Sequence, residues 1–226
     1  MPAILERFSL KNKLVVVLGA DGRIGQIAMR TVKELDGTAI GLDLPDCDIT
    51  SLASLYQHNQ RIAEMSAGGA NAVINCTVGN QTPTWPPNAG FAGDLAIGLT
   101  GAANALEAFT IKPGGSHTLI GSDLSFKAPD PQRYPQGSLK PASYSAIKAG
   151  LLGLTRYYAV YLAKNHVRVN LFAPAHLESG QLIPDSPIPR TCQPIEIATA
   201  IAFLVSDASS YMTGAELRCD GGASIW

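Results

Sequence analysis

The chain contains a short, wholly apolar run, Leu14-Val-Val-Val-Leu18, which passes directly into a glycine-rich turn. A strand without any polar position has to be buried on both faces, as happens in parallel sheets that helices cover on each side. The turn, Gly19-Ala-Asp-Gly-Arg-Ile-Gly25, leads into a stretch with helical patterning from about residue 24 to residue 35. This strand–turn–helix unit predicts an α/β fold.

The same alternation continues along the rest of the chain. We expect further strands at residues 38–42, 72–76, 117–121, 167–172 and 216–218, with helices at 51–65, 94–109, 144–163 and within 191–204. Such an order requires parallel pairing with right-handed crossovers. We therefore predict one domain over residues 1–226, a doubly wound parallel sheet in a three-layer α-β-α sandwich. Ligands of such sheets bind beyond the carboxyl ends of the strands.

Charge and cysteine spacing exclude several classes of protein. The 17 basic and 18 acidic residues leave a formal charge of -1, which excludes the basic footprint of a nucleic-acid-binding or membrane-surface protein. The cysteines are far apart and form no C-x-x-C pair, so we expect neither a metal site nor a disulfide framework. The first residues lack the apolar stretch of a signal peptide, and we expect a cytoplasmic protein. The cysteines are Cys47, Cys76, Cys192 and Cys219.

The glycine-rich turn is typical of a dinucleotide site. Gly19 allows the tight turn out of the strand, Gly22 leaves the backbone open to a pyrophosphate, and Gly25 lets helix and strand approach closely. The helix that follows offers unpaired N–H groups and the positive end of its dipole to the phosphates. Because the turn follows a strand and opens a helix, it predicts nucleotide binding more strongly than three glycines alone would.

An acidic residue favours NAD over NADP. Asp43 ends the second predicted strand, 18 residues after Gly25, where a carboxylate accepts hydrogen bonds from the adenosine ribose and repels a 2′-phosphate. Leu44 rather than a basic residue follows it. Arg23, inside the turn, is a guanidinium that a phosphate could use, so NADP remains the less favoured alternative.

A tyrosine and a lysine share one face of the longest predicted helix. Tyr144 and Lys148 are four residues apart, so the ammonium is expected to lie near the phenol. A nearby positive charge lowers the pKa of a tyrosine and suits it to exchange a proton with an alcohol or a carbonyl. Ser122 stands just past the strand at 117–121, where a hydroxyl can hold the substrate oxygen.

Together these residues carry a resemblance that covers essentially the full length of the chain. The chain resembles the short-chain dehydrogenase/reductase superfamily. The resemblance implies a Rossmann fold, a nicotinamide cofactor and hydride transfer between it and a small secondary alcohol or ketone, in a homo-dimer or homo-tetramer. The motifs, in the family's order, are the glycine turn, Asp43, Asp48-Ile49, Asn75, Gly121-Ser122, Tyr144 with Lys148, Arg168-Val-Asn170, Pro174, Thr213-Gly214 and Asp220-Gly-Gly222.

The resemblance also implies roles for individual residues. Tyr144 would be the general acid/base, Ser122 would polarise the carbonyl, and Lys148 would bind the nicotinamide ribose and depress the pKa of Tyr144. Further cofactor contacts are implied for Gly19, Gly22, Arg23, Ile24, Gly25, Asp43, Asp48, Ile49, Asn75, Cys76, Thr77, Pro174, Ala175, Leu177 and Ser179.

Two departures from the family pattern keep an alternative open. The glycine turn begins Leu18-Gly19 and has Arg23 where the family has glycine, and Gly98 aligns with an asparagine that holds a proton-relay water. A nucleotide-binding regulator or scaffold that has lost catalysis is therefore the alternative to an active enzyme. An epimerase or dehydratase of sugar nucleotides is disfavoured, because those relatives carry an additional substrate domain.

The segment before Tyr144 is longer than usual for the family, since 22 positions separate it from Ser122. Residues 126–141 carry several polar and charged side chains, and we expect them at the mouth of the site. A polar lining suits a hydroxylated substrate such as a sugar derivative. The alternative is a solvated loop without a substrate role.

Overall fold

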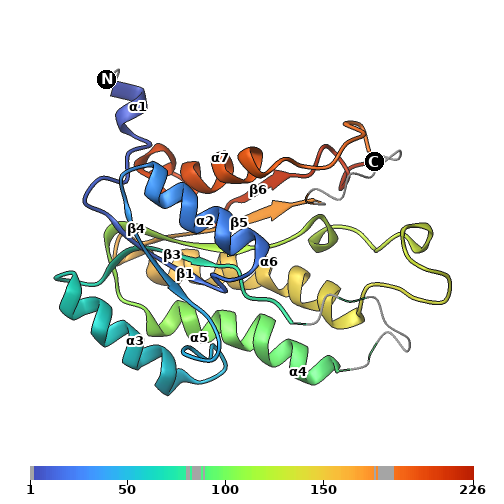
Figure 1. Ribbon diagram of the computed structural model, residues 1–226, viewed down its shortest axis with the longest axis horizontal. Helices are drawn as coiled ribbons and strands as arrows, with labels where there is room; N and C mark the ends of the chain where they lie inside the picture. The colour runs from blue at the N-terminus through green and yellow to red at the C-terminus, as the bar shows by residue number, and fades with distance from the viewer. Residues whose placement is uncertain (1–2, 80–81, 83–87, 89, 176, 178–185) are drawn as a thin grey trace.

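The sheet has six parallel strands in the order β2-β1-β3-β4-β5-β6 (Figure 1). The computed structural model describes residues 3–79, 82, 88, 90–175, 177 and 186–226. From β1 the chain first goes outward to β2 and then returns to β3 on the other side of β1, which confirms the doubly wound α/β fold. The strands are β1 (Leu14–Leu18), β2 (Thr38–Leu42), β3 (Ala70–Asn75), β4 (Ile111–Ile120), β5 (Arg168–Pro174) and β6 (Glu216–Cys219).

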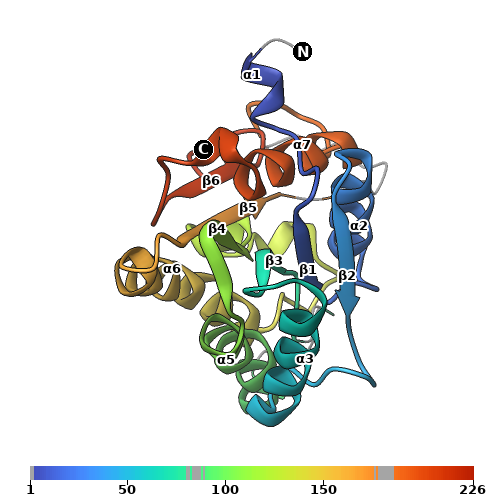
Figure 2. The same cartoon turned by 90° about the vertical axis from the view of Figure 1, so that its left-hand side faces the viewer.

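Helices cover both faces of the sheet (Figure 2). One face carries α2 (Arg23–Glu34) and α7 (Pro194–Val205). The other carries α3 (Leu52–Met65), α5 (Gly101–Ala108) and α6 (Ala142–Ala163). The short helix α1 (Ala3–Glu6) stands at the start of the chain, and α4 (Phe91–Leu95) leads toward α5 and packs against α6 on the same face of the sheet (Figure 1). In the described ranges, no helix is long and apolar enough to cross a membrane.

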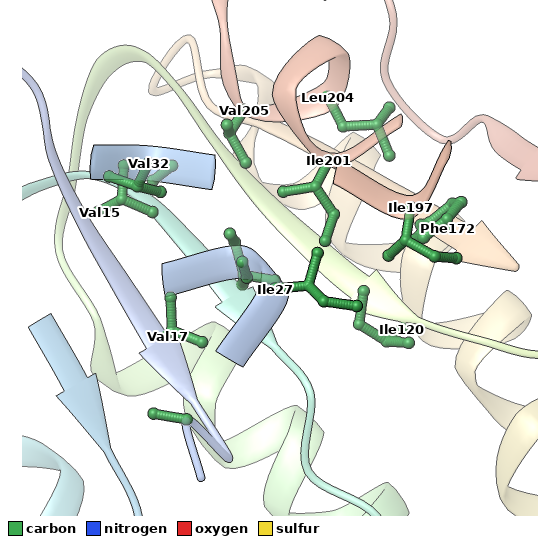
Figure 3. Packing of buried hydrophobic residues seen from close by; sticks show 14 of the residues in the cluster. Val15, Val17, Ile27, Val32, Ile120, Phe172, Ile197, Ile201, Leu204 and Val205 are labelled. Carbon is green, nitrogen blue, oxygen red and sulfur yellow. The ribbon is translucent and has the colours of Figure 1, made fainter. Parts of the chain in front are cut away.

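Strand β1 shows why its sequence is wholly apolar. Val15 and Val17 belong to the core between the sheet and the helices α2 and α7, where Ile27 and Ile201 also pack (Figure 3). Val16, on the opposite face of the strand, belongs to a second core under α3 and α5. Successive side chains of a strand point to opposite faces, so a strand between two helical layers needs an apolar residue at every position.

The helix predicted at 94–109 is the element that differs most from expectation. It consists of α4, a π-helical turn at Ala96–Thr100, and α5. Small residues let this segment lie close to its neighbours, because a Cβ added at Gly101 would come within 2.8 Å of the Ile49 side chain. Strand β4 also begins six residues earlier than predicted, at Ile111, where Lys112, Gly114 and Gly115 obscure the apolar pattern.

Candidate active site

The residues singled out in the sequence gather beyond the carboxyl ends of the strands. A cavity of about 490 Å³ lies there, and a smaller one of about 240 Å³ shares Gly22, Cys76 and Val78 with it. The larger cavity is lined by the glycine turn, the end of β4, the first turns of α6, the segment after β5 and the β4–α6 connection. Its lining includes Gly22, Arg23, Ile24, Gly25, Cys76, Ser122, Tyr144, Lys148, Pro174, Ala175 and Leu177.

The glycine turn is built for close approach of the backbone. Gly19 has φ +73, and a Cβ there would lie 3.0 Å from the backbone of Cys76 and Thr77. A Cβ at Gly25 would lie 2.1 Å from the carbonyl oxygen of Gly19, so no other residue fits this place. Helix α2 begins directly after Gly22, and no side chain caps its first N–H groups. These donors fit the diphosphate of a dinucleotide.

The smaller cavity brings together the residues expected around the adenosine. It is lined by Gly19, Asp43, Asp48, Ile49 and Thr77, among others. The Asp43 carboxylate accepts hydrogen bonds from the backbone N–H groups of Asp21, at 3.0 Å, and Leu44, at 2.9 Å. These bonds hold the carboxylate at the end of β2, beside the cavity, with lone pairs left for ribose hydroxyls.

Asn75 ends β3 directly before Cys76, which lines both cavities. Its side-chain oxygen accepts hydrogen bonds from the backbone N–H of Thr77, at 3.0 Å, and from the Thr77 hydroxyl, at 2.6 Å. Its side-chain nitrogen is buried and has no hydrogen-bond partner among the described residues. A buried donor without a partner is costly, and a ligand in the cleft is one way to satisfy it.

Ser122 is held firmly by the 3₁₀ turn that follows β4 (Asp123–Ser125). Its backbone N–H donates to the Ser125 hydroxyl, and its own oxygen accepts from the N–H of Leu124 at 3.2 Å. The Ser122 hydroxyl donates to the Asp123 carboxylate at 2.9 Å. Asp123, which the sequence analysis did not single out, is buried and also pairs with Lys127 at 3.2 Å. The carboxylate directly after Ser122 was its only sequence signal.

Helix α6 places Tyr144 and Lys148 on the cavity side. The helix start is anchored by the Ser143 hydroxyl, which donates to the buried Asp94 at 2.5 Å. The Lys148 ammonium donates to the Ile120 carbonyl at 2.6 Å and lies 5.5 Å from the centre of the Tyr144 ring. The helical spacing therefore does bring the two side chains together.

The electrostatics differ from the expectation that Lys148 lowers the pKa of Tyr144. Burial, the largest effect, raises the pKa of Tyr144; a hydrogen bond with Ser122 opposes this, and the Asp123 charge adds to it. Burial also lowers the pKa of Lys148 to about 8. The expectation was wrong because spacing along a helix does not reveal desolvation, which acts on both groups here.

The β4–α6 connection supplies further charged side chains. Arg133, Tyr134 and Lys140 line the larger cavity together with Tyr144, so this segment does lie at the mouth of the site. The Lys140 ammonium is 4.7 Å from the centre of the Tyr144 ring, and partial burial lowers its pKa. Arg133 pairs with Asp130 at 3.5 Å. The sequence analysis expected polar side chains of residues 126–141 here but did not single out Lys140, a lone basic residue before the helix.

The segment after β5 closes the far side of the cavity. Pro174, Ala175 and Leu177 line it, as the resemblance implied. Ser179 lies outside the described residues. Gly98, in the π-helical turn, is buried against Ile147, the residue before Lys148.

Comparisons with known proteins agree with this arrangement. The family described as enoyl-(acyl carrier protein) reductase matches residues 15–224. The chain belongs to the short-chain dehydrogenase/reductase superfamily. A cis-4-hydroxycyclohexanecarboxylate dehydrogenase of Sinomonas cyclohexanicum is 41% identical to this chain. The alignment covers 97% of this chain and 90% of that protein. A 2-dehydro-3-deoxy-D-gluconate 5-dehydrogenase of Escherichia coli is 27% identical over 97% of this chain and 98% of that protein.

Solved structures share the fold of this dehydrogenase/reductase at low sequence identity. A short-chain dehydrogenase of Leptospira borgpetersenii with bound NAD+ has a TM-score of 0.81 at 22% identity, over 96% of this chain and 94% of that one. A gluconate 5-dehydrogenase of Burkholderia cenocepacia with NADP and tartrate has a TM-score of 0.77 at 20% identity, over 98% of this chain and 99% of that one. The family match and the relatives show that the protein is an oxidoreductase of the dehydrogenase/reductase type.

Proposed function

We propose that the protein interconverts a secondary alcohol and a ketone with NAD, and that residues 1–226 act as one domain in doing so. The observation that carries this proposal is that Ser122, Tyr144 and Lys148 line one cavity, which adjoins the pocket beside Asp43. A bound nicotinamide supplies the hydride donor or acceptor. The Tyr144 phenol gives a proton to the carbonyl oxygen in reduction and takes it back in oxidation, while Ser122 holds that oxygen.

The position of Arg23 supports NAD rather than NADP. Arg23 lines the larger cavity together with Ser122 and Tyr144, whereas the smaller cavity beside Asp43 does not include it. A guanidinium in the larger cavity is suited to the diphosphate or the substrate and not to a 2′-phosphate on the adenosine. The Asp43 carboxylate would repel that phosphate.

The charges at the mouth support a substrate that carries a carboxylate next to its hydroxyl-bearing carbons. Among the described residues, the larger cavity is lined by four basic side chains, Arg23, Arg133, Lys140 and Lys148, and by one acidic side chain, Asp123. The Lys140 ammonium lies beside the Tyr144 ring. The relative from Sinomonas cyclohexanicum is named for a hydroxy acid, and the one from Escherichia coli for a sugar acid. We propose a hydroxylated carboxylic acid, which is also compatible with a sugar-derived substrate.

An exposed apolar face supports a homo-oligomer, dimeric or tetrameric. On α6, Tyr157, Val160 and Tyr161 expose 64%, 80% and 51% of their surface. The rings of Tyr157 and Tyr161 stack with their centres 6.2 Å apart. Large apolar side chains gathered on one helix are typical of a surface that a second subunit covers.

The first test separates catalysis from cofactor binding. Tyr144→Phe should abolish turnover of every substrate and leave the affinity for NADH, measured by its fluorescence, within about twofold of the wild type, since binding relies on other groups. Full activity of this variant would overturn the mechanism. An enzyme that binds NADH but reduces no ketone of a broad panel would instead be the impaired regulator or scaffold, which the departure at Gly98 favours.

The second test addresses the substrate class. Oxidation of cis-4-hydroxycyclohexanecarboxylate, gluconate and their primary amides is followed by the absorbance of NADH. Lys140→Met should raise the KM for the acids at least about tenfold, the effect of losing a charge-assisted hydrogen bond, and leave the amides unchanged. Lys164→Met, at the far end of α6, is the matched control. Equal use of acids and amides by the wild type would exclude a carboxylate site.

A further inference from the structure

Two cysteines far apart in the sequence meet beside the cofactor cavity. The sulfur atoms of Cys192 and Cys219 are 3.8 Å apart, although 27 positions separate them in the chain. Cys192 lies just before α7, and Cys219 is the last residue of β6. Both are free thiols in the structure. Their sequence spacing resembles no known pair motif, so only the fold reveals this contact.

Both cysteines are attached to the segment that closes the nicotinamide side of the cavity. The backbone N–H of Ala175 donates to the carbonyl oxygen of Cys219 at 3.1 Å, and Pro174 is paired with Cys219 across β5 and β6. Leu177, two residues further, forms a β-bridge with Cys192. Ala175 and Leu177 line the larger cavity. The two cysteines therefore hold this segment from both of its ends.

The pair is polarised in the way that thiol–disulfide exchange requires. The contact with Cys192 lowers the pKa of Cys219, an effect that Arg190 assists and that burial, Glu196 and Asp220 oppose. The same contact raises the pKa of Cys192. Cys219 is partly exposed, whereas Cys192 is buried. Cys219 is thus the more accessible nucleophile of the pair. Cys192 is placed to attack a mixed disulfide that forms on Cys219.

We propose that Cys192 and Cys219 are a reversible dithiol–disulfide pair whose closure weakens binding at the nicotinamide end of the site. The oxidant is a small-molecule disulfide. The Cys219 thiolate attacks one of its sulfurs, forming a mixed disulfide and releasing one thiolate. Cys192 then loses its proton to solvent and attacks the Cys219 sulfur, forming the protein disulfide and releasing the second thiolate. The dithiol is oxidised by two electrons, and the small disulfide is reduced to two thiols.

Closure links the two places to which this segment is attached. A disulfide bond is about 2.05 Å long, so the two sulfurs approach each other by nearly 2 Å. The new bond joins the end of β6 covalently to Cys192, just before α7. Ala175 is hydrogen-bonded to Cys219 and Leu177 is bridged to Cys192, so we expect the bond to shift both residues against the cavity. The adenosine pocket beside Asp43 shares no residue with this segment.

The covalent step is tested by mass, without reference to activity. The full-length protein is incubated with oxidised glutathione, alkylated and digested. The expected product is a peptide pair linked through Cys192 and Cys219 with the loss of two hydrogens, restored by dithiothreitol, while Cys47 and Cys76 stay alkylated. Stable glutathione adducts on separate cysteines, or no reaction at Cys219, would overturn the pair. Cys192→Ser should stop at the Cys219–glutathione adduct.

The coupling to the cofactor is tested by binding, and it rests on the proposed function. NADH should bind the oxidised protein at least about fivefold more weakly than the reduced one, a shift in the usual range of coupled sites, and AMP equally to both. Cys219→Ser should bind NADH as the reduced wild type does, with or without oxidant. A cross-linked protein with unchanged NADH affinity would refute the coupling. A protein that binds no dinucleotide in either state would refute the proposed function, while the mass result stands independently.

Discussion

Ile147 fills the space into which a side chain at position 98 would extend. A Cβ added to Gly98 would lie 2.8 Å from both the Cδ1 and the Cγ2 atom of Ile147, well inside van der Waals contact. The family's asparagine at this position therefore does not fit beside this isoleucine. Gly98 and Ile147 are a matched pair, and the departure from the family pattern is a feature of packing.

This pairing predicts a non-additive effect on stability. Gly98→Asn should lower the free energy of unfolding by about 1–3 kcal/mol through overpacking, measured by urea denaturation. The double variant Gly98→Asn/Ile147→Ala should lose less stability than the two single variants together. The difference should be at least about 1 kcal/mol. Gly153→Asn on α6 is the control, because its Cβ meets no atom within 4 Å. Strict additivity would show that the two positions do not compete for space.

Cofactor binding should depend on pH through Lys148. Its pKa of about 8 means that the ammonium loses its charge as the pH rises past that value. NADH carries negative charge, so its affinity should fall as the pH increases from 7 to 9, as followed by fluorescence titration. Lys148→Met should bind more weakly at pH 7 and lose most of this dependence. The same pH dependence in the variant would assign it to another group.

Cofactor preference should depend on the charge of Asp43. Asp43→Asn keeps a side-chain oxygen for one of the two N–H groups, that of Asp21 or that of Leu44, and removes the negative charge. The ratio of kcat/KM for NAD to that for NADP should drop at least about tenfold, or about 1.4 kcal/mol. Asp36→Asn, at an exposed acid just before β2 and therefore at the opposite end of that strand from Asp43, should leave the ratio unchanged. A wild type that prefers NADP would contradict this interpretation of Asp43.

The buried His117 on β4 predicts loss of stability in acid. Burial lowers the pKa of His117 to about 4 from 6.5, so the unfolded chain binds a proton that the folded protein does not. Its contribution is fully present above pH 6.5 and is lost as the pH falls toward 4, by about 3 kcal/mol in all. His117→Leu should flatten this part of the curve of unfolding free energy against pH. Replacement of the exposed His166 by Asn is the matched control.

Local patterns were enough to predict the framework of the protein. The apolar run at Leu14–Leu18, the glycine spacing and the alternation of elements predicted the parallel sheet, because strand burial and turn geometry depend on neighbours in the sequence. The same applies to Tyr144 and Lys148, since one helical turn brings them to one side regardless of what surrounds them. Formal charge and the position of Asp43 likewise follow from the sequence alone.

Tertiary structure decided what these groups experience. The raised pKa of Tyr144 and the lowered pKa of Lys148 come from exclusion of water, which depends on every element packed around them. The contact between Cys192 and Cys219 and the fit of Ile147 against Gly98 join segments that no spacing rule relates. Sequence periodicity reports which side of a helix or strand a residue occupies, whereas solvation and long-range contact depend on how the layers finally pack.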